Sequence, residues 1–335
     1  MPTDIGVVGA GAWGTVLAKV LADKGERVTL WCHGADSFRQ IAETRENAIY
    51  LPGILLPVNV VPTQSLSETV AQKSLVICAL PSHVVREIFS QAASFIAPQT
   101  MVICGTKGLE EETLKTMGEL FGDLFGAASK GKHAFLSGPT FAIEVARRLP
   151  AAVTVAAGDP RVAESVQRTL STQNFRVYTS SDVVGVQMGG VVKNVIAIAA
   201  GISDGLSLGQ NARAALTTRG LAEITRLAVR MGADPLTLAG LPGLGDLILT
   251  CTGDLSRNRA VGLQIARGKS LQEIVASTRS VAEGVRNTRS VRMLAERLGV
   301  DMPIVEQMHQ VLYRHKAPAD AVRDLMQRSL KPEAG

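Results

Sequence analysis

The stretch IGVVGAGAWG, residues 5–14, decides the fold of this 335-residue chain. It begins with the short β-branched run Ile5–Val8 and continues into the pattern G-x-G-x-x-G. Gly9 permits a tight turn, Gly11 lets the backbone approach a pyrophosphate, and Gly14 lets the following helix pack against the strand. The amides of that helix would then face the phosphates of a dinucleotide. A glycine-rich turn without a ligand would carry the same glycines.

The residues after this turn complete a β–α–β unit. Thr15–Lys24 has apolar residues at helical spacing, Gly25 ends the helix, and Arg27–Trp31 follows as a second strand. Because the glycines lie between a strand and a helix within such a unit, they indicate dinucleotide binding rather than a bare turn.

The end of the second strand normally distinguishes NAD from NADP. A carboxylate there bonds the ribose 2′-hydroxyl and would repel a 2′-phosphate. This chain has Cys32-His33-Gly34 instead, and the nearest acid is Asp36. His33 and Arg39 could accompany a 2′-phosphate, although an ordinary surface histidine is the alternative for His33. The sequence therefore predicts that NADP is used and that NAD is also accepted.

Strand-like runs recur through roughly the first 180 residues, with helical stretches between many of them. These runs are Leu75–Leu80, Met101–Cys104, His133–Leu136, Ala152–Ala156 and Phe175–Tyr178. Alternation of this kind favours an α/β fold with a doubly wound sheet of the Rossmann type.

After about Asp182 the strand-like runs nearly vanish and long helical patterns take their place. The expected helices are Gln187–Ile202, Asn211–Met231, Arg257–Arg267, Val285–Leu298, Pro303–Tyr313 and Pro318–Gln327. Loops rich in Gly, Pro and Asp separate them, among them residues 240–246. We therefore expect a dinucleotide-binding domain over residues 1–182 and an all-helical C-terminal domain for substrate binding and catalysis over residues 183–335.

The first of these helices carries one lysine in an apolar sequence. The segment GGVVKNVIAIAAGISDG, residues 189–205, has Lys193 as its only basic residue. Burying an ammonium ion is costly, so the pKa of such a lysine tends to fall. An amine of this kind can transfer protons near neutral pH, and Lys193 is therefore the candidate acid–base group.

Two segments that follow strands offer polar groups to a ligand. Ligands of doubly wound sheets lie outside the carboxyl ends of the strands, which is where Lys107 is expected. A solvated loop lysine would give the same pattern. Residues 137–142, SGPTFA, follow another strand and open a helix, so their amides and the Thr140 hydroxyl are available to an anion.

The helical half adds a carboxylate and an arginine. Asp246, expected in a glycine-rich loop, could orient and stabilise a protonated lysine. Arg257 follows Ser256 at a helix start; its planar fork suits phosphate, and the serine can cap the helix while binding the same anion. A capped, solvated helix start is the alternative for this segment.

Composition excludes several classes of protein. The net charge of +5 is mild and the basic residues form no run, so we expect no nucleic-acid partner. The four cysteines form no C-x-x-C pair and are expected to be buried, reduced thiols rather than metal ligands, which suits a cytoplasmic protein. No signal peptide and no uninterrupted apolar run of about 18 residues is seen, so no membrane span is expected.

Together these motifs resemble the bacterial NAD(P)-dependent sn-glycerol-3-phosphate dehydrogenases from end to end. Small departures are Ala12, where serine is common, and Val191, where alanine is common. The matching segments are GAGAWGT (9–15), PSHV (81–84), TKGLE (106–110), SGPTFA (137–142), FRVY (175–178), GVQMGGVVKNVIAIAAGISDG (185–205), GLGDLILTCT (243–252), SRNR (256–259) and VAEGVRNT (281–288).

The resemblance implies reversible hydride transfer between NAD(P)H and dihydroxyacetone phosphate or sn-glycerol 3-phosphate, with Lys193 as the proton acceptor. It also implies that reduction, which supplies phospholipid synthesis, is the usual direction. The residues implied to surround the substrate, beside Lys193, are Lys107, Gly138, Thr140, Asp246, Ser256, Arg257 and Asn258. The cofactor residues, with the fingerprint glycines Gly9, Gly11 and Gly14, are Ala12, Trp13, His33, Lys107, Ala142, Arg257, Val281 and Glu283.

Two other functions fit parts of the pattern. A β-hydroxyacid dehydrogenase also joins a Rossmann domain to a helical domain with a catalytic lysine, but it lacks the SRNR and GLGDL segments. A non-catalytic NAD(P)-sensing module would leave Lys193, Asp246 and Arg257 unexplained. The long apolar helix faces would allow two chains to pair as a homodimer.

Overall fold

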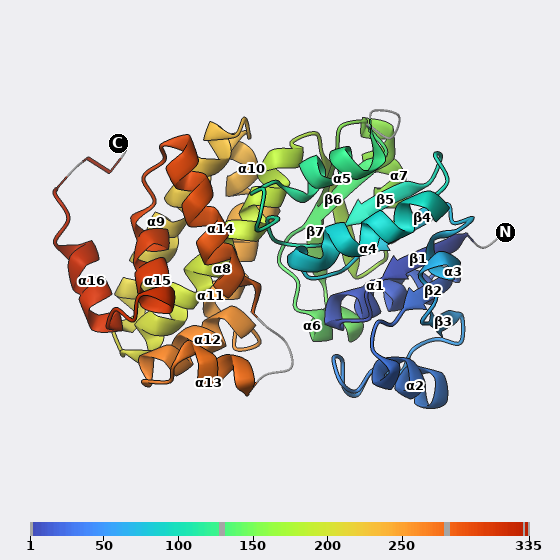
Figure 1. The fold of residues 1–335 in the computed structure, drawn as a ribbon, viewed down its shortest axis with the longest axis horizontal. Coiled ribbons are helices and arrows are strands. Elements are labelled where there is room, and N and C mark those ends of the chain that lie inside the picture. Colours follow the sequence, from blue (N-terminus) through green and yellow to red (C-terminus); the bar gives the residue numbers. More distant parts are fainter. Residues whose placement is uncertain (1–2, 127–130, 278–281, 331, 334–335) are drawn as a thin grey trace.

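The computed structural model describes residues 3–126, 131–277, 282–330 and 332–333. Figure 1 shows a sheet-containing half, in blue to green, beside a helical half, in yellow to red. The N-terminus lies at the outer end of the sheet half and the C-terminus at the outer end of the helical half. The two predicted parts of the fold are both present, and their sequence segments follow one another along the chain.

The first half is built on one eight-stranded sheet in the order β3-β2-β1-β4-β5-β6-β7-β8. Every neighbouring pair is parallel except β6 and β7. The order reverses between β1 and β4, and this is where the crevice for a ligand lies in doubly wound sheets. The strands are β1 (Asp4–Val8), β2 (Arg27–Trp31), β3 (Val60–Thr63), β4 (Leu75–Cys78), β5 (Met101–Cys104), β6 (His133–Ser137), β7 (Ala151–Ala157) and β8 (Phe175–Ser180).

Helices cover both faces of the sheet, so its strands are buried on both sides. In β4, Leu75 and Ile77 face one apolar core, whereas Val76 and Cys78 face the other. A continuous apolar run is what a strand covered on both faces requires. The helices of this half are α1 (Ala12–Asp23), α2 (Ala35–Thr44), α3 (Leu66–Val70), α4 (Val85–Ala92), α5 (Met117–Phe125), α6 (Ala142–Ala146) and α7 (Pro160–Leu170).

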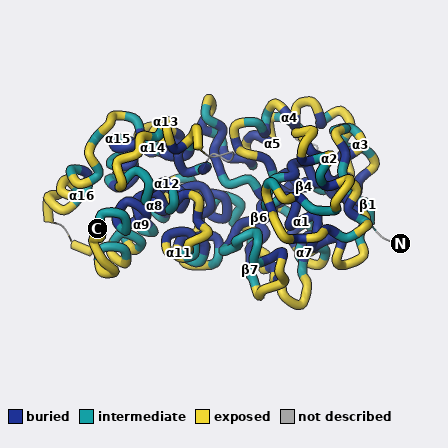
Figure 2. The backbone as a smooth tube through the Cα atoms, turned by 90° about the horizontal axis from the view of Figure 1, so that it is seen from below, coloured by how far each residue is buried: buried dark blue, intermediate teal, exposed yellow. Residues whose placement is uncertain are grey.

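In the second half, all the regular elements formed by the described residues after β8 are helices. At its centre lies α8, which is buried from Gly185 to Ser203 and packs against α9, α11, α12 and α14. Figure 2 shows this helix surrounded by the others. The helices are α8 (Val183–Gly205), α9 (Gly209–Arg230), α10 (Pro235–Ala239), α11 (Asp246–Thr252), α12 (Arg257–Ala266), α13 (Leu271–Ala276), α14 (Glu283–Leu298), α15 (Pro303–Tyr313) and α16 (Pro318–Met326).

By length and composition, α8 is the one helix among the described residues that could cross a membrane. In the structure, 83% of its most apolar window is buried inside the protein. The apolar residues of α8 therefore serve here as the core of the helical half.

The structure corrects two details of the predicted elements. β3 was not predicted, because Pro62 interrupts its apolar run; it pairs only with β2, and an edge strand tolerates proline. The expected loop at residues 240–246 is wrong as well. Leu241–Gly245 forms a π-helical turn that leads directly into α11, so Asp246 is the first residue of a helix. Turns of this kind often occur at functional sites.

Candidate active site

Lys193 of α8 and Asp246 of α11 form a buried pair in the helical half. The Lys193 side chain is 7% exposed and that of Asp246 is 1% exposed. The Lys193 ammonium donates to one oxygen of Asp246 and to the Thr250 hydroxyl, the latter at 2.8 Å. Burial lowers the pKa of Lys193 to about 8, with the charge of Lys107 acting in the same direction and Asp246 opposing both.

Two glycines of α8 allow this pair to form. A Cβ at Gly189 would lie 2.3 Å from the carbonyl oxygen of Pro242, in the π-helical turn before Asp246. Gly189 is four residues before Lys193, so both lie on the same face of the helix. The missing side chain therefore lets the turn approach α8 and brings the aspartate to the lysine. At Gly190, a Cβ would lie 3.3 Å from Cγ of Lys107, so this glycine makes room for the stem of a second lysine.

Lys107 reaches the same carboxylate from the sheet half. Its Nζ lies 2.6 Å from Asp246 Oδ2 and 3.2 Å from the carbonyl oxygen of Gly138, and its side chain is 20% exposed. One carboxylate therefore lies between two ammonium groups, one from each half of the molecule. Because Lys107 follows β5, the pair is located at the carboxyl edge of the sheet, where the helical half covers it.

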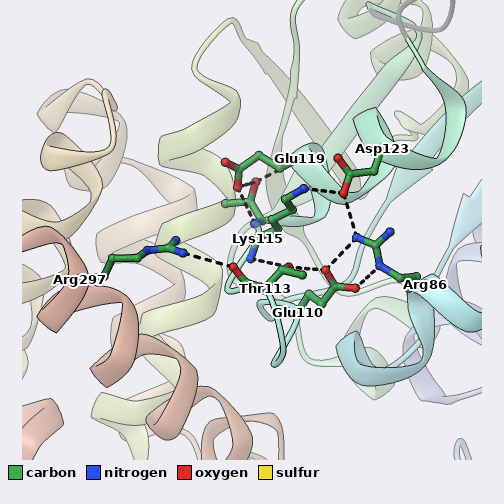
Figure 3. A network of polar contacts seen from close by, with 8 residues as sticks. Arg86, Glu110, Thr113, Lys115, Glu119, Asp123 and Arg297 are labelled. Atoms are coloured by element: carbon green, nitrogen blue, oxygen red, sulfur yellow. Dashed lines mark hydrogen bonds and ion pairs between the residues drawn. The ribbon is translucent and has the colours of Figure 1, made fainter.

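The loop that carries Lys107, residues 105–116, is held from both sides. On the sheet side, Arg86 pairs with Glu110, with Nη2 2.9 Å from Oε2 (Figure 3). On the helical side, Arg297 of α14 donates to the carbonyl oxygen of Thr113 at 3.4 Å (Figure 3). These contacts hold the part of the loop around Glu110 and Thr113 between the two halves.

The glycine turn after β1 has the geometry of a dinucleotide cradle. Gly9 has φ +119°, which favours glycine, and a Cβ at Gly14 would lie 1.9 Å from the Gly9 carbonyl oxygen. A Cβ at Gly11 would meet no atom within 4 Å, so open space lies above it. Gly11 precedes α1, whose N-terminus has no side-chain cap, and its first amides are therefore available to a phosphate. The residues of this turn fit the predicted cofactor.

His33 lies exposed just beyond β2, and its ring is 5.4 Å from that of Trp31. The first acidic residue after it is Asp36, in the first turn of α2. No carboxylate therefore occupies the strand end itself.

The family models match both halves of the chain. Residues 4–163 match the N-terminal domain, and residues 182–323 the C-terminal domain, of NAD-dependent glycerol-3-phosphate dehydrogenase. The chain belongs to this family. A relative named glycerol-3-phosphate dehydrogenase [NAD(P)+] from Citrifermentans bemidjiense is 51% identical over 333 residues, covering 99% of each chain. One of the same name from Anaeromyxobacter sp. (strain K) is 53% identical over 327 residues, covering 98% of each.

Solved structures of this dehydrogenase family have the same fold. The crystal structure of the glycerol-3-phosphate dehydrogenase from Coxiella burnetii is 38% identical, with a TM-score of 0.94 over 98% of this chain and 99% of that one. The yeast enzyme from Saccharomyces cerevisiae is 27% identical, with a TM-score of 0.82 over 98% of this chain and all of that one. Membership of this family decides against a β-hydroxyacid dehydrogenase.

Other predicted substrate residues lie at the start of α12, which packs against α8, and they have partners within the protein. Ser256 caps α12, because its hydroxyl accepts from the amide of Arg259 at 3.2 Å. Asn258 is buried; it donates to Asn194 at 2.9 Å and accepts from the Gly284 amide at 2.9 Å. Arg257 is exposed at the first position of α12. Their contact with substrate remains a prediction.

The remaining predicted residues line the edge of the sheet. Ala12 and Trp13 begin α1, and Ala142 begins α6. The Thr140 hydroxyl lies 3.4 Å from the Gly138 carbonyl oxygen.

Glu283 begins α14 and accepts from the Ser82 hydroxyl at 3.1 Å, so it too connects the halves, and burial raises its pKa. Val281 lies outside the described residues.

Three polar groups around the pair were not predicted from the sequence. Thr250 lies one turn after Asp246 on α11, so its i, i+4 spacing from the aspartate was an available signal. The Ser137 hydroxyl is buried and has no hydrogen-bond partner among the described residues. Asn287 contacts Lys107, and no signal in the sequence connected them.

The cysteines agree with the sequence analysis, since all four are free and buried. Among the described residues, no three His, Cys, Asp or Glu side chains gather into a group that could hold a metal ion.

Proposed function

We propose that this chain catalyses the reversible, NAD(P)-dependent interconversion of sn-glycerol 3-phosphate and dihydroxyacetone phosphate. The observation that carries the proposal is the buried Lys193–Asp246 pair beside Lys107, at the carboxyl edge of a sheet that has a dinucleotide cradle. Relatives bearing that enzyme's name align over almost the whole chain.

In this proposal Lys193 moves the proton. In oxidation its neutral amine accepts the proton of the C2 hydroxyl, and in reduction its ammonium returns it. The ammonium also stabilises negative charge that develops on that oxygen. Asp246 and Thr250 orient the amine, because each bonds Nζ directly. Lys107 adds a second positive charge for the substrate.

The remaining polar groups hold the two ligands. The residues proposed to bind the substrate are Gly138, Thr140, Ser256, Arg257 and Asn258. The guanidinium of Arg257 is proposed to bind the substrate phosphate. The cofactor, when bound, supplies hydride chemistry at its nicotinamide ring. The residues proposed to hold it are Gly9, Gly11, Ala12, Trp13, Gly14, His33, Lys107, Ala142, Arg257, Val281 and Glu283.

Further parts of the proposal concern the chain as a whole. Residues 1–182 are proposed to form the dinucleotide-binding domain and residues 183–335 the helical substrate domain. The enzyme is proposed to work in the cytoplasm, where buried thiols stay reduced, and to reduce dihydroxyacetone phosphate for phospholipid synthesis. Pairing into a homodimer is proposed from its apolar helix faces, and sedimentation equilibrium tests it.

The central experiment is oxidation of NADH and NADPH with dihydroxyacetone phosphate, beside a control without substrate. We expect both cofactors to be oxidised only when the substrate is present. Unphosphorylated dihydroxyacetone should be a poor substrate, because it lacks the group that Arg257 would bind. Cofactor binding without turnover would instead support the sensing module.

The Lys193→Met variant tests the acid–base role. Methionine suits the apolar helix, so the fold should persist while the proton donor is lost. We expect kcat to fall by about 10²–10⁴-fold, the usual contribution of a general acid–base group, with little change in cofactor Kd. Near-normal kcat in this variant would contradict the role of Lys193.

A further inference from the structure

One buried amide connects the two halves of the molecule beside the lysines. Asn287 of α14 is 1% exposed, and its Nδ2 lies 3.1 Å from the carbonyl oxygen of Lys107 and 3.1 Å from that of Val191. Carbonyl oxygens only accept, so the amide nitrogen must face both of them. Since Val191 lies two residues before Lys193, this one side chain fastens the Lys107 loop to the helix that carries the acid–base amine.

The backbone of the loop passes directly over this amide. A Cβ at Gly108, the residue after Lys107, would lie 3.1 Å from Asn287 Oδ1 and 2.3 Å from the Ser82 hydroxyl. The absence of a side chain at Gly108 therefore permits the close approach that the hydrogen bond from Asn287 requires.

The other contacts between α14 and the loop contribute less to holding the loop in place. Arg286 pairs with Glu111 at 2.8 Å, but the two side chains are 38% and 35% exposed, and pairs so exposed contribute little. Arg297 donates to the carbonyl oxygen of Thr113, farther along the loop, at the longer distance of 3.4 Å. Removing Asn287 would instead leave the part-buried carbonyl oxygen of Lys107 without this donor, whereas the carbonyl oxygen of Val191 would keep the hydrogen bond of its own helix. The loss of a donor inside the molecule costs more than the loss of an exposed ion pair.

We propose that Asn287 is a positioning residue, whose amide holds the loop so that Lys107 lies beside Asp246. The inference rests on the proposed function, in which Lys193 transfers the proton. If Lys107 leaves its place, its positive charge moves away from the Lys193 amine and Asp246 is shared no longer. Both changes favour the protonated amine, so they should raise the pKa of Lys193.

The test measures this pKa without relying on activity. The enzyme is labelled with ε-¹³C-lysine and titrated by NMR, and the resonance missing in Lys193→Met identifies Lys193. Lys107→Met gives the rise produced by removing the charge outright. We expect Asn287→Ala to raise the pKa of Lys193 by about half of that rise or more, because the amide is what holds the charge in place.

Kinetics should show the same dependence. In Asn287→Ala, kcat/KM for dihydroxyacetone phosphate should fall by about tenfold, chiefly through KM, because the loss falls on a substrate-binding lysine. The double variant Lys107→Met/Asn287→Ala should have a kcat/KM little lower than that of Lys107→Met alone, since the two residues act through one contact.

Thr288→Val is the matched control. Thr288 is the next residue of α14, is fully buried, and donates only within its own helix, to the Gly284 carbonyl oxygen at 2.7 Å. It should lose a comparable hydrogen bond while leaving the pKa of Lys193 unchanged. If Asn287→Ala does not fold, Asn287→Ser, which can donate to one carbonyl oxygen only, should show a smaller rise in the same direction.

An unchanged pKa of Lys193 in both Asn287 variants would overturn the inference, and so would an unchanged pKa in Lys107→Met. If Thr288→Val shifts the pKa of Lys193 as much as Asn287→Ala does, the effect of Asn287 is one of general packing, and the inference is overturned too. A failure of the proposed function is seen separately, as a wild-type enzyme that titrates as expected but does not reduce dihydroxyacetone phosphate.

Discussion

Lys193 owes its chemistry to its surroundings, because burial and the charge of Lys107 lower its pKa to about 8. In oxidation the amine must be neutral, so kcat/KM for glycerol 3-phosphate should rise with pH and level off above about 8. In reduction the amine must be protonated, so kcat/KM for dihydroxyacetone phosphate should fall above about 8. The substrate phosphate titrates near pH 6, roughly two units below Lys193, and therefore gives a separate limb in the pH profile of kcat/KM.

The two directions should therefore show opposite slopes around one shared pKa. Initial rates at low substrate, measured at constant ionic strength in both directions, check this expectation. The Lys193→Met variant should lose that limb and keep the one due to phosphate. A limb that survives in this variant would assign the titration to another group.

His33 is predicted to govern the choice of cofactor, since no carboxylate occupies the end of β2. His33→Asp should repel a 2′-phosphate and offer an acceptor to a 2′-hydroxyl. The ratio of kcat/KM for NADPH over NADH should fall by about tenfold or more, roughly 1.4 kcal/mol. His33→Asn, which removes the imidazole without adding charge, is the control at the same ionic strength. An unchanged ratio in His33→Asp would show that this position does not read the ribose.

At the scale of the element, the turn between β1 and α1 separates a binding glycine from a structural one. Gly11 has φ −72° and ψ 179°, and a Cβ there meets open space, so Gly11→Ala should fold with its stability within about 0.5 kcal/mol of wild type. The new methyl group would occupy the space proposed for the pyrophosphate. We expect the Kd for NADH to rise by about tenfold or more.

Gly14→Ala should instead lower the stability of the fold while leaving the Kd for NADH little changed. Its Cβ would meet the Gly9 carbonyl oxygen at 1.9 Å, so the backbone must move, at a cost of about 1–3 kcal/mol. Urea unfolding and NADH fluorescence titration of the two variants distinguish the roles. Normal cofactor binding by Gly11→Ala would contradict the placement of the pyrophosphate over this glycine.

The sequence predicted the elements whose patterns are long or uninterrupted. The runs that became β1, β2 and β4 to β8 are apolar because helices cover both faces of the sheet, and α8 is apolar because it lies at the centre of the helical half. It did not predict α10, the π-helical turn or α11, whose segment is short and interrupted by Pro242 and glycines. The aspartate was recognised as a partner for a lysine, but its place on a helix was not.

The contacts that assemble the site could not be predicted from local pattern. Lys107 and Asp246 are 139 positions apart, and Lys107 and Asn287 are 180 apart. They meet because α11 and α14, which both pack against α8, reach the loop after β5 that carries Lys107. Lys193 was predictable because its own helix sets its burial, whereas the role of Asn287 depends on which loop happens to lie over α14.

For the whole molecule, the contacts of the Lys107 loop and of Glu283 with Ser82 make the two halves depend on each other. The proposed cofactor residues also come from both halves, so a bound cofactor should stabilise the molecule as a unit. At 100 times its Kd it adds about 2.7 kcal/mol, which for a chain of this size corresponds to a rise in Tm of about 4 °C. Differential scanning calorimetry with NADPH measures this rise.

The shape of the calorimetric transition decides where the cofactor acts. If it contacts both halves, the whole transition should move to higher temperature and stay single. A transition that splits, with only one component shifted, would mean that the cofactor binds the sheet half alone and that Arg257 and Glu283 do not reach it. Lys193→Met should show the full rise, because its lysine is not among the cofactor residues. Gly11→Ala should show about half of the rise or less at the same NADPH concentration, because its Kd is expected to be about tenfold higher or more.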